Sequence, residues 1–419
     1  MELLYVISMI MLTVLIVYDI GMALFSKDKS LIWSPKTFLV LCIGYYIYLP
    51  TFKAYELISP SAHGYMWFST LLYYICFRIG FKYSYPQIRF HKLNNLIQQK
   101  HALRIAIVLF TISFLIFFAF NDFSLSFINS VTEAREFDEN ESYSHPEQYL
   151  TNLVACFCFA ASLSYIAKEK FDFKVLGMLC IAVIVYIIGG FRYRLLLLFI
   201  SFFTVYHLYP EAKSINYKVV VPLFIGLYAL VGLMEQTRSY GNGMDAERLN
   251  DVLSGQVELK DAKENIFVYT YSAKVIEQSS INNLLYLEPI VNAILMPLPR
   301  TLFPWKPKGV YTRETSWRVL GNISEGQAFC TITEGYLSFW WFGIIFYGYF
   351  LGWLSKLFWL NYSENRRKIG AILLLALYNA IIYVIFSRGY LAQAFTQLIY
   401  YVFVPFWLVI FLRKIKILR

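Results

Sequence analysis

Four arginines lie near the ends of apolar segments, and they are the first candidates for chemistry. Arg192 and Arg194 occupy the turn GGFRYR, Arg238 follows the apolar stretch ending in MEQT, and Arg388 lies in SRGY. An arginine at the centre of a membrane helix costs about 2.5–3.5 kcal/mol on insertion scales. Any single one of these arginines could be explained by snorkelling to the interface or by pairing with an acid such as Glu235. Four of them at the ends of different segments favour convergence on one anionic group.

A second group of cations lies in residues 296–309, MPLPRTLFPWKPKG. Its prolines fix φ and remove backbone donors, which predicts a stiff, extended segment. Arg300 offers a planar fork to a phosphate, whereas Lys306 and Lys308 offer point charges. The alternative interpretation is an interfacial belt, in which Trp305 and the two lysines anchor the segment at lipid headgroups.

The acidic residues give one candidate for proton transfer. Glu334 lies where a long polar segment meets an apolar one, so it can act as a general base or pair with an arginine. Glu136 and Asp138 resemble a two-carboxylate metal site, but the run EAREFDENE is typical of a solvated acidic loop, so we predict no metal. Asp19, inside the first apolar segment, is expected to hydrogen-bond to neighbouring helices and not to act in catalysis.

No nucleotide-binding or hydrolase motif is present: the sequence has no P-loop, no Gly-rich dinucleotide fingerprint and no G-x-S-x-G elbow. We therefore predict no cofactor. A reaction on the outer face of a membrane then needs a substrate that carries its own activated bond. A lipid-linked diphosphate meets this requirement, because its tail partitions among helices and its headgroup would meet the arginines.

Composition identifies the elements that must position these residues. Of the 419 residues, 58% are hydrophobic and only 15% are charged, against about 25% in soluble domains. Many apolar runs approach the ~20 residues that cross a bilayer. The net charge of +10 comes from cations clustered at the ends of these runs, which is typical of membrane orientation and speaks against nucleic acid as a partner. The sequence predicts a single all-α polytopic membrane domain, 1–419.

Eleven transmembrane spans are predicted, at approximately residues 2–25, 33–52, 62–81, 104–121, 149–167, 175–190, 194–209, 218–235, 335–356, 369–387 and 394–412. Loops on alternate sides hold 22 and 15 of the Lys and Arg residues, and the richer side includes the basic C-terminal segment. By the positive-inside rule the C-terminus is cytoplasmic, and with eleven spans the N-terminus is outside.

Two outer loops are large. Residues 122–148 are acidic, and residues 236–334 separate spans eight and nine. A loop of that length is usually functional. Within it, residues 282–296 are too short and interrupted to span, so they are expected to form an interfacial helix or a re-entrant segment. No internal repeat is visible, which speaks against an inverted-repeat transporter.

The stretch PLPRTLFPWKPKG resembles the Pro-Arg … Lys-Pro element in the outer loop of bacterial oligosaccharide repeat-unit polymerases, the Wzy-type O-antigen polymerases. Some twenty-five residues later, SEGQAFCTITEGYLSFWWFGIIFYGYFLGW is similar to their Glu-x-Tyr-x-x-(Phe/Trp)-x-x-Gly entry into the next span. The motif match covers residues 296–353, and elsewhere the likeness is architectural. Two positions depart from the family pattern: Ser338 replaces the usual asparagine or similar polar residue, and the glycine comes late, at Gly343.

The resemblance implies a membrane glycosyltransferase of GT-C-like architecture in the bacterial cytoplasmic membrane, with its active site on the outer face. It would polymerise undecaprenyl-diphosphate-linked oligosaccharide repeat units, with a chain-length regulator as a possible partner protein. Glu334, Arg300 and Arg388 would be catalytic, with Glu334 as the base. The expected diphosphate ligands are Arg192, Arg194, Arg238, Lys306 and Lys308, and the expected sugar-stacking rings are Trp305, Tyr311 and Trp317. The alternatives are an O-antigen ligase-type transferase and a lipid-linked oligosaccharide flippase or other transporter.

Overall fold

The computed structural model describes residues 2–119, 152–188, 192–213, 264–298, 328–387 and 389–417, with a few single positions between them. Within these ranges the chain is helical and contains no strand. The α-helices are α1 (Glu2–Phe25), α2 (Pro35–Ile43), α3 (Leu49–Ala54), α4 (Pro60–Tyr83), α5 (His91–Asn94), α6 (Gln99–Ala119), α9 (Cys156–Lys168), α10 (Phe173–Ile188), α11 (Arg192–Leu208), α14 (Glu264–Gln278), α15 (Glu288–Leu295), α17 (Thr331–Glu364), α18 (Ile369–Ser387), α19 (Leu391–Gln397) and α20 (Val404–Lys414). Short π-helices join α2 to α3 (Gly44–Tyr48) and α19 to α20 (Leu398–Phe403).

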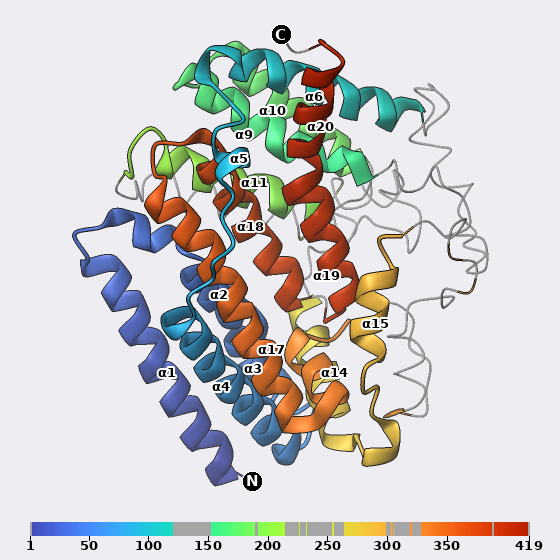
Figure 1. The fold of residues 1–419 in the computed structure, drawn as a ribbon. Helices are drawn as coiled ribbons and strands as arrows, with labels where there is room; N and C mark the ends of the chain where they lie inside the picture. Colours follow the sequence, from blue (N-terminus) through green and yellow to red (C-terminus); the bar gives the residue numbers. More distant parts are fainter. Residues whose placement is uncertain are drawn as a thin grey trace.

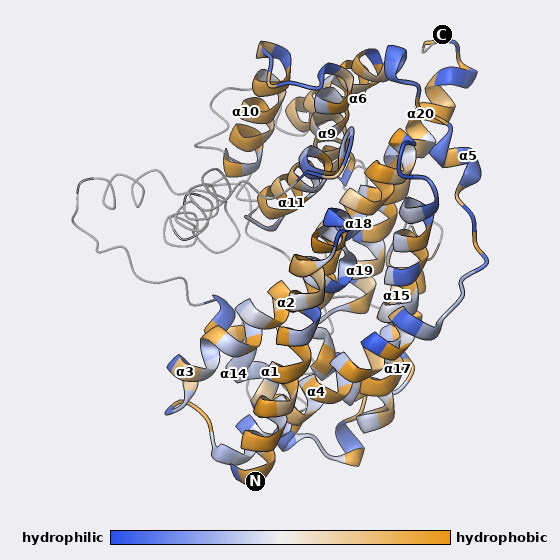
Figure 2. Ribbon diagram, turned by 90° about the vertical axis from the view of Figure 1, so that its left-hand side faces the viewer, coloured by the Kyte–Doolittle hydropathy of each residue, from blue (hydrophilic) through white to orange (hydrophobic). Residues whose placement is uncertain are grey.

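Six helical segments of the described part are long and apolar enough to cross a membrane, which is consistent with a polytopic membrane protein. They are Glu2–Phe25, Pro35–Ala54, Gln99–Ala119, Thr331–Glu364, Ile369–Ser387 and Leu391–Lys414. Every predicted span falls on a helix of the structure except 218–235, which lies outside the described residues. Three of the predicted spans fall on apolar helices that are shorter than the six candidates, at Asn152–Lys168, Phe173–Ile187 and Tyr193–Leu208. Figure 2 shows hydrophobic residues along the helices and hydrophilic ones gathered in the connections.

Glycines bring α4 and α17 into backbone contact. A Cβ added at Gly348 would lie 2.5 Å from the carbonyl oxygen of Tyr73, and one at Gly352 would lie 2.2 Å from that of Phe77. A step of four residues along α17 thus matches a step of four along α4 in the same direction, so the two helices run parallel. This is the close approach that a small-x-x-x-small pattern allows between membrane helices.

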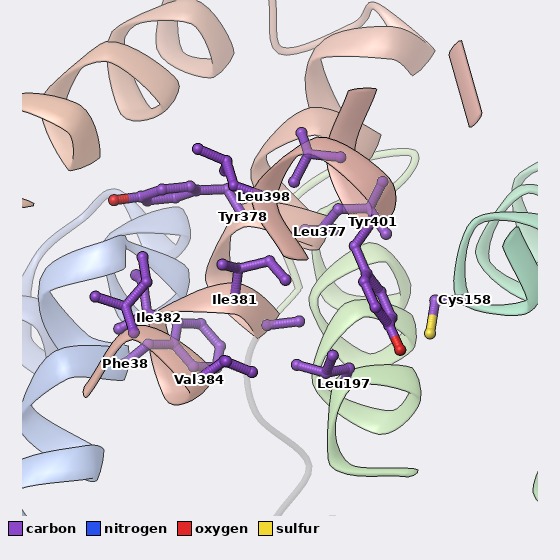
Figure 3. Close-up of a cluster of buried hydrophobic side chains, with 14 of the residues drawn as sticks. Phe38, Cys158, Leu197, Leu377, Tyr378, Ile381, Ile382, Val384, Leu398 and Tyr401 are labelled. Carbon is purple, nitrogen blue, oxygen red and sulfur yellow. The ribbon is translucent and has the colours of Figure 1, made fainter. Parts of the chain in front are cut away.

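Helix α18 forms the centre of the molecule, and 89% of its apolar window is buried. It packs against α2, α11 and α17. Figure 3 shows side chains of α18 among those of neighbouring helices, including Phe38 and Leu197. Two polar contacts add to this packing: the Asn379 side chain donates to the Trp33 carbonyl at 2.8 Å, and the Tyr378 and Ser355 hydroxyls are 2.8 Å apart.

The described helices form two regions. Helices α1, α4, α14 and α17 lie toward the end that carries the N-terminus, and α6, α9 and α10 lie toward the end that carries the C-terminus (Figure 1). Helices α18 and α19 lie between them. The predicted non-spanning segment 282–296 contains α15, whose eight residues are too few to cross a bilayer. Helix α15 packs against α19.

The turns after α1 and between α17 and α18 are joined by an ion pair of Asp28 with Arg366. Asp28 also accepts hydrogen bonds from the backbone and hydroxyl of Ser30. Partial burial alone would raise the pKa of Asp28, but the bonds from Arg366 and Ser30 hold that pKa below its ordinary value. A depressed carboxyl pKa contributes stability above the unfolded pKa, and this contribution is lost as the pH falls through the folded pKa.

We therefore expect Arg366→Gln to lower the thermal midpoint at neutral pH by a small amount. Both side chains are partly exposed, so the loss in unfolding free energy is at most about 1 kcal/mol. The difference from wild type should shrink as the pH falls below about 4 and through the lower folded-state pKa of Asp28, below which the carboxyl is protonated in both states. Thermal unfolding in detergent at pH 7 and at pH 3 measures this. Arg367→Gln, at an exposed neighbouring position, is the control; a pH-independent difference for Arg366→Gln would contradict the prediction.

Candidate active site

Helix α17 is two helices joined by a reversal. Phe339 and Trp340 have non-helical backbone angles, and Trp340 has a φ of 54°. A Cβ added at Gly343 would lie 1.8 Å from the carbonyl oxygen of Gly335, although eight residues of straight helix would separate them by about 12 Å. The chain therefore turns back on itself. We call residues 331–338 the re-entrant helix and residues 341–364 the long helix.

This reversal corrects the predicted start of span nine at residue 335. Residues 335–338 belong to the re-entrant helix, and the long helix begins after Trp340. Apart from Ser338, the sequence from Gly335 to Gly343 is apolar and aromatic, so hydropathy alone could not show the break. The two departures from the family pattern lie at this place: Ser338 ends the re-entrant helix, and Gly343 supplies the space for Gly335.

Helices α14 and α18 hold the start of the re-entrant helix. The Cys330 amide donates to the Ser272 hydroxyl of α14 at 2.9 Å, and the Thr333 hydroxyl reaches the Ser272 carbonyl at 3.5 Å. The Thr331 hydroxyl donates to the carbonyl of Ile385 in α18. These contacts place the first turn of the re-entrant helix in the protein interior, where each polar group needs a partner.

The other end of the re-entrant helix is also tied down. The Leu285 amide, in the segment before α15, donates to the Leu337 carbonyl at 2.8 Å. The Ser338 hydroxyl donates to the Glu334 carbonyl at 2.9 Å and lies 3.2 Å from the Tyr347 hydroxyl of the long helix. The last carbonyls of a helix have no amide partner in a following turn. Here the Leu337 carbonyl finds its partner in the Leu285 amide, which stabilises the short helix in an apolar environment.

Glu334 lies at the centre of this arrangement and is fully buried, at 0% exposure. Its two carboxylate oxygens accept the backbone N–H of Leu391 at 3.0 and 2.9 Å. Leu391 is the first residue of α19, where backbone amides lack partners within the helix and negative charge is favoured. The carboxylate therefore fixes the start of α19 to the re-entrant helix.

A tight turn between α18 and α19 completes the site. Gly389 has a φ of +33°, and an added Cβ would lie 2.0 Å from the carbonyl oxygen of Phe329, so this position requires glycine. Phe329 lies two residues before the re-entrant helix. The site therefore joins residues 328–338 to residues 389–391, and Arg388 adjoins the second segment in the sequence, although it lies outside the described residues.

An apolar cluster supports these segments from one side. It joins α14, α15, the re-entrant helix and α19, and its buried members are Tyr271, Val275, Leu285, Ala293, Phe329, Leu337, Tyr390 and Ala392. Because side chains from four segments pack here, the position of the Glu334 carboxylate is set by tertiary packing and not by local sequence alone.

The structure places Arg194 in a different buried cluster. The Arg194 side chain is 6% exposed, and its Nε donates to the Tyr193 hydroxyl at 3.1 Å. Tyr401 and Cys158 lie nearby, and Figure 3 shows these two side chains close to each other. Tyr401 follows Leu391 by ten residues of helix, or about 15 Å. Glu334 therefore lies at the start of the segment Leu391–Lys414 and Arg194 near its middle, and the two are not brought together.

Most of the other predicted site residues lie outside the described part of the chain. These are Arg238, Arg300, Lys306, Lys308, Tyr311, Trp317 and Arg388, and the acidic segment 122–148 lies outside it as well. Arg192 is the first residue of α11, but its side chain is not described. Trp305 is 68% exposed, with its ring 5.9 Å from that of Phe303. The diphosphate clamp therefore stays a prediction.

The predicted hydrogen bonding of Asp19 to neighbouring helices is confirmed. Its carboxylate is buried and accepts the Tyr74 hydroxyl at 2.6 Å. Lys36 Nζ and Arg78 Nε lie 2.9 and 3.0 Å from its oxygens. Asp19 thus links α1 to α2 and α4. Sequence reasoning had not identified its two cationic partners, although both lie on the predicted basic side.

No group of three or more His, Cys, Asp and Glu side chains within the described ranges could hold a metal ion. The chemistry that the described site offers is that of one buried carboxylate at a helix start, next to a turn whose sequence carries an arginine. No protein-family model, curated protein or solved structure matches this chain.

Proposed function

We propose that this chain is a membrane glycosyltransferase that polymerises undecaprenyl-diphosphate-linked oligosaccharide repeat units on the outer face of the bacterial cytoplasmic membrane. One observation carries the proposal: the segment with the Glu-x-Tyr motif forms a re-entrant helix, and Glu334 binds the α18–α19 turn that contains Arg388 in the sequence. Two segments singled out for their chemistry, 57 residues apart, thus meet at one buried place.

The proposed reaction needs charge neutralisation more than acid catalysis. A hydroxyl of one repeat unit attacks the anomeric carbon of the glycan on the other lipid and releases its proton to solvent, and the diphosphate departs with the electrons of its bond to that carbon. Diphosphate is already a good leaving group, so fixed cations that stabilise its developing charge are the main requirement. Arg388 and Arg300 are the residues proposed for this task, with Lys306 and Lys308 assisting.

We infer that Glu334 acts as a positioning residue. A carboxylate that is fully buried and bonded to a helix start has no open side for a sugar hydroxyl. It can, however, hold the turn that carries Arg388 in one conformation, and a preorganised cation stabilises charge better than a mobile one. The role of general base, expected from the sequence, makes the opposite prediction for one substitution, which is treated in the Discussion.

The described helices support the proposed topology. Spans one, three and nine are all odd-numbered, so they should run in the same direction. Helix α4 runs parallel to the long helix, and α1 runs parallel to α4, because Tyr5 lies by His63 and Asp19 by Tyr74. The termini lie at opposite ends of the molecule (Figure 1), as an odd number of spans requires. We propose eleven spans in a GT-C-like arrangement with the N-terminus outside, and the parallel directions of α1, α4 and the long helix support the odd numbering of these three spans.

Polymerisation of a purified lipid-linked repeat unit by the purified chain tests the proposal. We expect a ladder of lipid-linked polymer, formed also in the presence of a metal chelator, and at least a hundredfold less from Arg388→Ala. A ladder of equal length and amount from Arg388→Ala and from Arg300→Ala would contradict the clamp. Absence of polymer with a repeat-unit acceptor, together with transfer to a lipid A-core acceptor, would instead identify a ligase-type enzyme.

A further inference from the structure

A cavity of about 790 Å³ lies between α1, α4 and α17, far from the re-entrant helix. Its longest wall consists of apolar side chains of α1, among them Val14 and Met22, which are 61% and 53% exposed. Helix α1 is the least buried of the candidate spans, at 17% of its apolar window. It lies at the edge of the bundle (Figure 1), and hydrophobic residues predominate along it in Figure 2. In a membrane, this wall faces lipid chains.

Four cations line the same cavity with a single carboxylate: Lys36, Arg78, Lys82 and Lys356 with Asp19. Asp19 binds Lys36 and Arg78 directly. Among the residues that the structure describes, no carboxylate lies within ion-pair distance of Lys82 or Lys356. The lining therefore carries a net charge of about +3 at neutral pH.

The positions of these cations are constrained before any ligand binds. Asp19 holds Arg78, whose guanidinium also lies 5.6 Å from the centre of the Tyr18 ring. Lys356 Nζ lies 5.5 Å from the centre of the Phe81 ring, a cation–π contact that holds the ammonium group at the cavity wall. A ligand that needs several donors at once would find them in place, which lowers the ordering cost of binding.

We propose that this cavity binds an anionic phospholipid of the membrane, with its acyl chains along α1 and its phosphate between Arg78, Lys82 and Lys356. Basic pockets between transmembrane helices recognise anionic headgroups, and an apolar wall adjoining the pocket accommodates the chains. A soluble anion would gain nothing from the apolar wall, and a zwitterionic lipid would leave the excess positive charge unbalanced. The inference concerns lipid binding and does not rest on the proposed glycosyltransferase activity.

Thermal unfolding of the delipidated full chain in neutral detergent tests this proposal. Phosphatidylglycerol is expected to raise the midpoint in a saturable manner, whereas phosphatidylcholine with the same acyl chains is not. Lys82→Gln with Lys356→Gln should weaken the apparent affinity for phosphatidylglycerol by about tenfold or more. The matched control, Lys100→Gln with Lys170→Gln, changes two exposed lysines elsewhere and should leave the affinity unchanged. Native mass spectrometry of bound lipid gives an independent readout.

Four results would each overturn the proposal. The first is an equal shift with phosphatidylcholine, which would mean binding without charge recognition. The second is an unchanged affinity for phosphatidylglycerol in the double variant. The third is the same stabilisation by glycerol phosphate alone, which would indicate a site for a free anion. The fourth is stabilisation by a polyprenyl phosphate but not by phosphatidylglycerol, which would assign the cavity to a substrate lipid.

Discussion

Glu334→Gln is expected to keep polymer formation within about tenfold of wild type, whereas Glu334→Ala should reduce it at least a hundredfold. The glutamine side-chain oxygen can still accept the N–H of Leu391, so the start of α19 and its preceding turn stay in place. Alanine leaves that amide without its acceptor in a fully buried site, which costs about 1–3 kcal/mol and frees the turn that carries Arg388.

The same pair of variants separates the two roles of Glu334. Loss of a general base costs about 10²–10⁴ in rate, and glutamine cannot replace a base. A general base therefore predicts equal, severe losses for both variants and the disappearance of the acid limb of the pH–rate profile. A positioning residue predicts a severe loss for alanine alone and an unchanged profile for glutamine.

In vitro polymerisation, scored by ladder length and initial rate from pH 5 to pH 9, makes this measurement. Glu277→Gln is a suitable control, because its carboxylate accepts hydrogen bonds from Ser59 and Ser61 near the start of α4. A Glu334→Gln variant as inactive as Glu334→Ala, with wild-type thermal stability, would contradict the positioning role.

Gly352→Leu is expected to destabilise the protein by about 3 kcal/mol or more and to lower its yield. A Cβ at Gly352 would lie 2.2 Å from the carbonyl oxygen of Phe77 and 2.8 Å from the amide nitrogen of Phe81. Both neighbours are helix backbone, which cannot move aside as a side chain can. Helix α4 must therefore separate from the long helix, and overpacking of this kind typically costs about 1–3 kcal/mol or more.

Thermal unfolding in detergent and the size-exclusion profile of the expressed protein report this effect. Gly177→Leu in α10 is the matched control, because an added Cβ there meets nothing within 4 Å. Leucine is also a better helix former than glycine, so the control should leave the midpoint unchanged or raise it. A Gly352→Leu protein with the wild-type midpoint would show that α4 and the long helix do not pack as described.

The sequence predicted the helices well, because a run of about 20 apolar residues has few alternatives to a helix in a membrane. It also predicted that Asp19 would bind neighbouring helices, since a carboxylate inside an apolar span needs partners. The reversal at Phe339 and Trp340 escaped prediction because a single serine, Ser338, is the only polar interruption of that stretch, and a serine is common inside membrane helices. Its signal was a pair of glycines, Gly335 and Gly343, whose significance depends on a contact that only the folded chain shows.

The candidate site was predicted in part. Glu334 was identified from its place at the start of a span, but it binds the backbone amide of Leu391, and a contact with a backbone amide cannot be recognised from the sequence. Arg194 lies among tyrosines, about 15 Å along the helix from the Leu391 amide that Glu334 binds, and its predicted convergence with the other arginines stays a prediction. Charge and position along the chain indicate which residues are costly to bury, but they do not indicate which of them meet.

The enclosure of α18 has a consequence for biogenesis. During synthesis this helix enters the bilayer before α19 and α20 exist, so lipid must first cover surfaces that later touch protein. Replacing lipid tails by apolar side chains around α18 gives no hydrophobic stabilisation, because lipid tails and apolar side chains are equally apolar. The late step of assembly must then be driven by shape and by the polar contacts of Asn379 and Tyr378. The high hydropathy of α18 therefore drives its insertion into the bilayer. Its final position among the other helices depends on Asn379 and Tyr378, two polar side chains that lower that hydropathy.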